Sequence, residues 1–198
     1  MNARSIALAI TFAAIAIALN TVKIPTIYLP GFSYHFNEIP LVVAFFLFGP
    51  KIGLLVGILH LAGQELLFPI GPTGIVAYPM GFLALLVMIS GTYVASRLIS
   101  QNPRPNNQFS EKRRSIWLTA CAATSRGGIM PVLQYFLLYG ILFPLVLGTD
   151  LPRTYAATLI PSFILYNVTV ALYSVPLAYL VAKEVSKRLR IGPSLMSK

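Results

Sequence analysis

The sequence predicts an all-α integral membrane protein with six transmembrane helices and both termini in the cytoplasm. Of its 198 residues, 57% are hydrophobic and only 10% are charged, with a mean hydropathy of +0.77. Soluble domains carry roughly 25% charged residues. Apolar stretches also recur along the whole chain. Because one crossing takes about 20 apolar residues, six of them leave no room for a separate soluble or nucleotide-hydrolysing domain, and residues 1–198 are expected to form a single membrane domain.

The first half of the chain is divided by Gly, Pro and aromatic residues. The first helix follows Arg4. The alternative, a cleaved signal peptide, is disfavoured because the apolar run continues almost to Lys23 and further spans follow. Residues 24–37 hold two prolines among aromatic residues and are expected to form an outer loop near the membrane surface. The second helix is too short for a hydrocarbon core of about 30 Å, so it either borrows length from this loop or lies in a cavity.

The second half contains longer apolar blocks. The stretch 116–147 exceeds one straight crossing, and Gly127, Gly128 and Pro131 are candidate positions for a kink. Polar residues 99–115 form the main cytoplasmic loop. We therefore expect helices at residues 5–22, 38–49, 52–68, 75–98, 116–147 and 155–182.

The charge distribution sets the expected orientation. The chain has 15 Lys and Arg against 5 Asp and Glu, and most of the basic residues cluster in and next to the 99–115 loop and in the C-terminal tail. Basic residues concentrate on the cytoplasmic side of membrane proteins, where they also meet anionic lipid of the bilayer. No aromatic residues interleave with the basic runs, so nucleic-acid binding is not expected.

Polar side chains inside apolar helices are the candidate functional residues, because they are costly in lipid unless they face a cavity or a partner. His60 and Gln64 share one face of the third helix, and Glu65 lies near its outer end. With Asn37 and Glu38 they are predicted to line an outward-facing polar pocket. The alternative is that His60 and Gln64 only hydrogen-bond neighbouring helices.

Three further residues of the later helices are candidates for substrate binding. Arg126 needs a counter-charge within the membrane. The candidates are Glu65, Glu38 and a carboxylate or phosphate group of a ligand. Asn167 is either a contact between helices or a ligand contact. Tyr78 belongs to a set of aromatic residues that serve as interfacial anchors or as stacking faces for a planar ligand.

Motifs for catalysis or metal binding are missing from the sequence. Two His and one Cys make a multi-ligand zinc site hard to assemble, and no nucleophile with a paired base is visible. We therefore expect no catalytic residues, no metal and no cofactor. The alternative is an intramembrane hydrolase or transferase that uses His60, Glu65 and Arg126.

Alanines at a spacing of four mark one helix for close packing. Small residues at this spacing let two helices approach closely in lipid. The candidate partner-docking residues of the first helix are Ala9, Ala13, Ala14 and Ala18.

The segment Phe36–Leu59, FNEIPLVVAFFLFGPKIGLLVGIL, resembles the substrate-binding S components of energy-coupling factor (ECF) vitamin transporters, nearest the riboflavin-specific branch. In that family an acidic residue and Ile-Pro open the second helix, and Gly-Pro followed by Gly closes the next turn. The residues in those places are Glu38, Ile39, Pro40, Gly49, Pro50 and Gly53.

This resemblance implies a function that composition does not show. The chain would be a multi-pass protein of the cell membrane that captures a vitamin, riboflavin or a related molecule, from outside, between the outer loop and the last three helices. The alanines of its first helix would dock on a transmembrane coupling subunit. Together with that subunit and two ATPase subunits it would support ATP-driven uptake.

Overall fold

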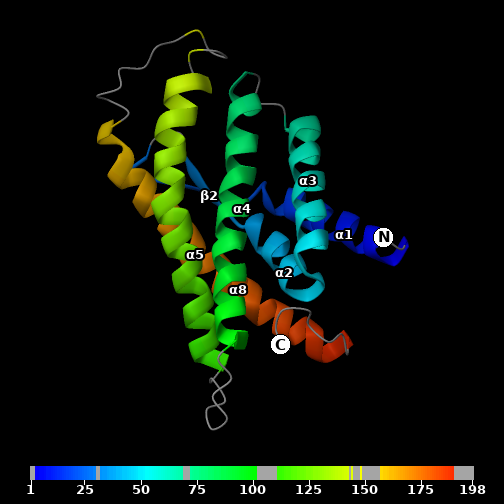
Figure 1. Ribbon diagram of the computed structural model, residues 1–198. Coiled ribbons are helices and arrows are strands. Elements are labelled where there is room, and N and C mark those ends of the chain that lie inside the picture. Colours follow the sequence, from blue (N-terminus) through cyan, green and yellow to red (C-terminus); the bar gives the residue numbers. More distant parts are fainter. Residues whose placement is uncertain are drawn as a thin grey trace.

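A computed structural model describes residues 3–29, 32–68, 72–101, 111–142, 144, 148 and 157–189. Its elements are mainly helices (Figure 1). In chain order they are α1 (Ala3–Leu19), β1 (Lys23–Pro25), β2 (Ser33–His35), α2 (Glu38–Phe48), α3 (Pro50–Leu67), α4 (Pro72–Gln101), α5 (Glu111–Leu133), the π-helix η1 (Gln134–Leu142) and α8 (Ile160–Leu189).

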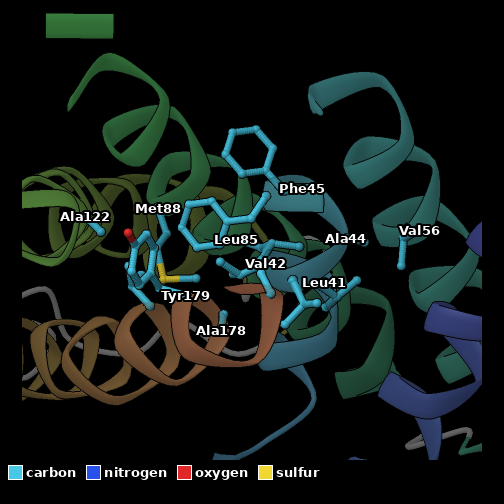
Figure 2. Close-up of a cluster of buried hydrophobic side chains, with 14 of the residues drawn as sticks. Leu41, Val42, Ala44, Phe45, Val56, Leu85, Met88, Ala122, Ala178 and Tyr179 are labelled. Atoms are coloured by element: carbon cyan, nitrogen blue, oxygen red, sulfur yellow. The ribbon is translucent and has the colours of Figure 1, made fainter. Parts of the chain in front are cut away.

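The short helix α2 forms the centre of the molecule. Every residue from Pro40 to Leu47 is buried, and α1, α3, α4 and α8 pack around it. Figure 2 shows its side chains meeting Leu85 and Met88 of α4 and Tyr179 of α8. A helix that is apolar on all sides is stable when it is enclosed by others. Since α2 is enclosed in this way, its short length needs no extension through the neighbouring loop.

The helices α3, α4 and α5 stand next to one another, and α8 runs obliquely behind α4 and α5 (Figure 1). Small residues allow the close approaches. Gly127 of α5 faces Val168 of α8, and a side chain at that position would overlap the valine. Ser125 of α5 also donates a hydrogen bond to the backbone carbonyl of Val87 in α4, at 3.3 Å. This packing brings the polar residues of α5 and α8 together.

The expected outer loop contains a β-hairpin, and the first helix ends earlier than the expected residue 22. The helix α1 stops at Leu19, and β1 then pairs antiparallel with β2, with Lys23 opposite His35 and Ile24 opposite Tyr34. Pro25 disfavours a helix here, whereas Ile24 and Tyr34, which face each other across the hairpin, are residue types that favour strands. A turn at residues 20–21 therefore takes the place of the last turn of the helix expected at residues 5–22, and the hairpin follows it.

The middle helices differ from the expected 38–49, 52–68 and 75–98. Gly49 has φ of 86° and separates α2 from α3, so α2 ends at Phe48 and α3 begins at Pro50 and ends at Leu67. Proline suits the first turn of a helix because its missing N–H has no helical partner there. The helix α4 runs beyond its apolar stretch at both ends, to Pro72 and Gln101.

The later helices also differ from the expected bounds. The helix α5 begins at Glu111, so the cytoplasmic loop expected at 99–115 is shorter, and residues 102–110 lie outside the described residues. The block expected at 116–147 changes to a π-helix at Gln134, just after Pro131, which lacks a backbone donor. The last helix, expected at 155–182, includes polar turns up to Leu189. Polar residues extend helices where hydropathy alone would end them.

The exterior of the bundle is apolar. Large hydrophobic side chains are exposed on α1, α3, α4, α5 and α8, among them Ile10, Leu54, Val94, Trp117 and Leu180. Within the described residues, two helices, Ala77–Ile99 and Ile160–Arg188, are long and apolar enough to cross a membrane. Apolar surface of this extent is unfavourable in water and favourable in lipid.

Candidate functional site

A buried ion pair joins the first turn of α2 to the middle of α5. Both terminal nitrogens of the Arg126 guanidinium contact the Glu38 carboxylate, with Nη2 donating to Oε1 at 2.9 Å and Nη1 donating to Oε2. The Arg126 side chain is 2% exposed and that of Glu38 is 15% exposed. An arginine at this depth requires a counter-charge. The structure thus identifies Glu38, among the three partners that the sequence left open, as the internal partner.

Two carboxamides extend this ion pair. Arg126 Nε donates to Asn167 Oδ1 at 3.1 Å. Asn167 Nδ2 in turn donates to Gln134 Oε1 at 3.2 Å and to the backbone carbonyl of Phe163 at 2.8 Å. We call Glu38, Arg126, Asn167 and Gln134 the charged network. Asn167 therefore makes the helix-to-helix contact that the sequence allowed.

Gln134 belongs to this network but was not among the sequence candidates. It lies two helical turns after Arg126, within an apolar stretch, and it is buried. An amide side chain two turns from a buried arginine falls on about the same helix face. The spacing between Arg126 and Gln134 was therefore the feature of the sequence that could have indicated Gln134 as a member of the site.

A second set of polar side chains lies between α1, α2 and α3. Asn37 Nδ2 contacts His60 Nε2 at 3.2 Å and Asn20 Oδ1 at 3.4 Å. Because an amide nitrogen only donates, His60 accepts through Nε2 and carries its proton on Nδ1. We call Asn20, Asn37 and His60 the neutral network. Asn20, directly after α1, was not among the sequence candidates, although it lies within the helix expected at residues 5–22.

Asn37 precedes α2 but does not cap it. An asparagine at this position commonly accepts a hydrogen bond from the first turn of the helix. Here no side-chain cap bond forms, and the amide of Asn37 turns toward His60 instead. The side chain is thus used for contact between elements.

The hairpin is held against α8 by tyrosines. Tyr166 donates its hydroxyl to the backbone carbonyl of Ser33 at 2.9 Å, and Tyr173 donates to that of His35 at 2.7 Å. The Tyr34 ring stacks on the Tyr166 ring, with centroids 5.3 Å apart and planes at 18°. We call Tyr34, Tyr166 and Tyr173 the aromatic seam. It fixes β2 directly before Asn37 and Glu38.

The electrostatics of the hairpin reflect this packing. Burial, together with a hydrogen bond to Tyr34, raises the pKa of Tyr28 to about 12. Burial, and then the positive charge of Lys23, lowers the pKa of His35 below its usual value. The Nδ1 atom of His35 is buried without a hydrogen-bond partner. The hairpin therefore favours a neutral His35.

The remaining candidates on α3 and α4 are separated from these networks. Gln64 is buried, and within the described part of the chain its side chain makes no hydrogen bond. Glu65 is half-buried next to it. Tyr78 donates its hydroxyl to the backbone carbonyl of Phe68 at 2.5 Å and so ties α4 to the end of α3.

The grouping required for the alternative enzyme is not assembled. His60 bonds to Asn37 and Arg126 pairs with Glu38, so no hydrogen bond or ion pair in the described residues links either one to Glu65. Those residues also contain no group of three or more His, Cys, Asp or Glu side chains that could hold a metal ion.

The alanines of α1 divide into two pairs. Ala9 and Ala13 are buried inside the molecule, at 0% and 4% exposure. Ala14 and Ala18 are exposed on the opposite side of the helix. Because α1 packs its buried side against α2 and α3, Ala9 and Ala13 are not part of an outward docking face in this structure. Of the four expected partner-docking residues, only Ala14 and Ala18 therefore remain available to contact another protein.

Comparisons with known proteins give a match at the level of structure only. No protein-family model matches the chain, and no curated protein matches it by sequence. Among solved structures, it is similar to one described as "Structure and mechanism of the S component of a bacterial ECF transporter". The match has a TM-score of 0.64 and 21% identity, and it covers 94% of this chain and 95% of the other. The chain therefore shares the fold of an ECF transporter S component.

Proposed function

We propose that this protein is the substrate-binding S component of an ECF-type importer. The observation that carries this proposal is the fold similarity to a bacterial S component over nearly the whole of both chains. The apolar exterior of the bundle and the two helices of membrane-spanning length among the described residues support it independently. In this proposal the chain crosses the cell membrane six times with both termini in the cytoplasm.

The proposed ligand is a vitamin taken up from outside. Its binding site includes the two networks that meet at the start of α2, with Gln64, Glu65 and Tyr78 as further candidate contacts. A short link connects the end of the hairpin at His35 to the start of α2 at Glu38. The aromatic seam holds this end of the hairpin through the bond from Tyr173 to the His35 carbonyl. The choice of riboflavin or a related molecule is supported only by the resemblance in Phe36–Leu59.

The proposed partners are a transmembrane coupling subunit and two ATPase subunits. The exposed side of α1, which carries Ala14 and Ala18, is the proposed docking face. Small exposed residues on a lipid-facing helix allow a second helix to approach closely. Energy for uptake would come from the ATPase subunits.

A binding assay tests the first part of this proposal. The purified protein in detergent is examined by thermal unfolding against a panel of vitamins, and its absorbance spectrum is inspected for a co-purified flavin. Binding to the folded state raises the unfolding temperature, and the stabilisation grows with the logarithm of the ratio of ligand concentration to dissociation constant. We expect stabilisation at submicromolar concentration by one compound. A protein that binds no small molecule, and instead turns over a substrate alone, would refute the proposal.

Two leucine substitutions test the docking face. Ala14→Leu is expected to abolish uptake in cells that express the coupling and ATPase subunits, while leaving ligand binding unchanged, because it adds bulk only outside the molecule. Ala13→Leu is the matched comparison, and it should destabilise the fold by about 1–3 kcal/mol through overpacking. Normal uptake by Ala14→Leu would remove α1 as the docking face.

A further inference from the structure

The only buried cation of the candidate site is already neutralised, as judged from the described residues. Both carboxylate oxygens of Glu38 are engaged by Arg126, and the third guanidinium nitrogen, Nε, bonds to Asn167. An anionic ligand would have to displace Glu38 from Arg126. That exchange would leave the Glu38 carboxylate without its counter-charge at 15% exposure, which is costly.

The same ion pair also neutralises the buried carboxylate of Glu38. Glu38 is bound on both oxygens by one guanidinium, so a cationic ligand would have to separate the pair from the other side. The neutral network carries no formal charge, because His60 accepts a hydrogen bond through Nε2. The polar groups at the start of α2 thus have no net charge to offer a ligand.

Two carboxamide side chains near the networks keep hydrogen-bond donors that no described residue uses. Gln134 accepts from Asn167 through Oε1, but its Nε2 makes no hydrogen bond within the described residues, although the side chain is only 6% exposed. Gln64 is equally buried and makes none through its side chain. A carboxamide nitrogen without a protein partner can donate a hydrogen bond to a ligand acceptor, and such a bond is favourable.

We infer that the ligand of the proposed site is an uncharged molecule that places a hydrogen-bond acceptor against Gln134 Nε2. This inference rests on the proposed binding function and adds the chemical class of the ligand. It also replaces the expectation that a ligand carboxylate or phosphate pairs with Arg126. The Glu38–Arg126 pair is then part of the wall of the site, and a ligand ion that binds to either of these two side chains must break the pair.

Matched pairs of compounds test the inference on the unaltered protein. Suitable pairs are riboflavin with riboflavin 5′-phosphate, nicotinamide with nicotinate, panthenol with pantothenate and biotinamide with biotin, and thiamin serves as a cationic probe. Affinities are measured by calorimetry in detergent. We expect the neutral member of one pair to bind at least tenfold more tightly than its anion.

The possible results separate this inference from the proposed function. Equal or tighter binding of an anion, or tightest binding of thiamin, would overturn the neutral-ligand inference and leave the S-component proposal standing. Failure of every vitamin to bind, together with no uptake in the presence of the coupling and ATPase subunits, would refute the proposed function and this inference with it.

A substitution tests the role of Gln134. Gln134→Met conserves volume but removes the amide donors, so it should weaken binding of the neutral ligand about tenfold. Ser90→Ala on the exposed face of α4 is the control and should bind normally. Unchanged affinity in a folded Gln134→Met protein would rule out this contact. The paired-compound measurement does not depend on the folding of any variant.

Discussion

Two polar networks diverge from consecutive residues, Asn37 and Glu38, and they are built in different ways. Glu38 reaches Arg126 in α5 and takes part in a bidentate ion pair that Asn167 extends. Asn37 reaches α1 and α3 through two longer contacts, at 3.2 and 3.4 Å, between uncharged groups. One network is therefore built on a bidentate ion pair and strongly coupled, whereas the other is weakly bonded.

This difference distinguishes polar groups that hold the fold from polar groups that can exchange their hydrogen-bond partners. Breaking a buried ion pair leaves an uncompensated charge, so the charged network resists rearrangement. Exchanging one neutral hydrogen bond for another costs little when water or a ligand supplies the new partner. We expect the neutral network to adapt when a ligand binds and the charged network to keep its geometry. Four measurements test this distinction.

The largest effect is expected for Glu38→Gln. The substitution leaves Arg126 buried without a counter-charge and should lower the free energy of unfolding by about 3–5 kcal/mol. Glu184→Gln is the control, because Glu184 pairs with Lys187 with both side chains 60% exposed, and such pairs contribute about 0–1 kcal/mol. Denaturant unfolding in detergent measures both. Equal effects of the two substitutions would show that the charged network is not the stronger one.

Removing Asn37 should have a smaller effect. Asn37→Ala eliminates the contacts to His60 and Asn20 and should cost about 1–2 kcal/mol, since only neutral hydrogen bonds are lost. The same unfolding assay applies. A loss as large as that of Glu38→Gln would contradict the contrast between the networks.

The hairpin is expected to depend on the tyrosine hydroxyls rather than on either network. Tyr166→Phe and Tyr173→Phe each remove one hydrogen bond to β2 and should cost about 1 kcal/mol. Faster hydrogen exchange confined to Ser33–His35 would show the local origin of the loss. Tyr135→Phe is the control, because its ring packs on Phe136 and its hydroxyl has no partner in the described structure. If hydrogen exchange also became faster in α2, the hairpin would not be independent of the two networks.

The smallest effect concerns pH. Burial lowers the pKa of His35 in the folded state, so the unfolded chain binds more protons as pH falls through the ordinary histidine pKa of about 6.5. Stability should therefore decrease below that pH. Replacing His35 with Asn should reduce this decrease, as measured by unfolding between pH 7.5 and 5. An unchanged pH profile in His35→Asn would exclude His35 as a contributor.

Part of the candidate site was predictable because helical spacing is a local property. His60 and Gln64 are both buried and Glu65 is only half-buried, as expected for residues four apart on one face. The cost of an arginine in an apolar stretch likewise predicted that Arg126 has a partner. The spacing of the α1 alanines also indicated close packing, but it did not distinguish the pair that packs inward from the pair that faces outward.

Hydropathy and residue spacing, read from the sequence alone, determined the helical class, the position of most helices and the set of polar residues that required partners. Tertiary structure alone decided that Glu38 rather than Glu65 neutralises Arg126, that Gln134 and Asn20 join the networks, and that Ala9 and Ala13 face inward. The physical reason is distance along the chain. The ion pair joins residues 88 positions apart, and only the packing of α2 against its neighbours brings such residues into contact.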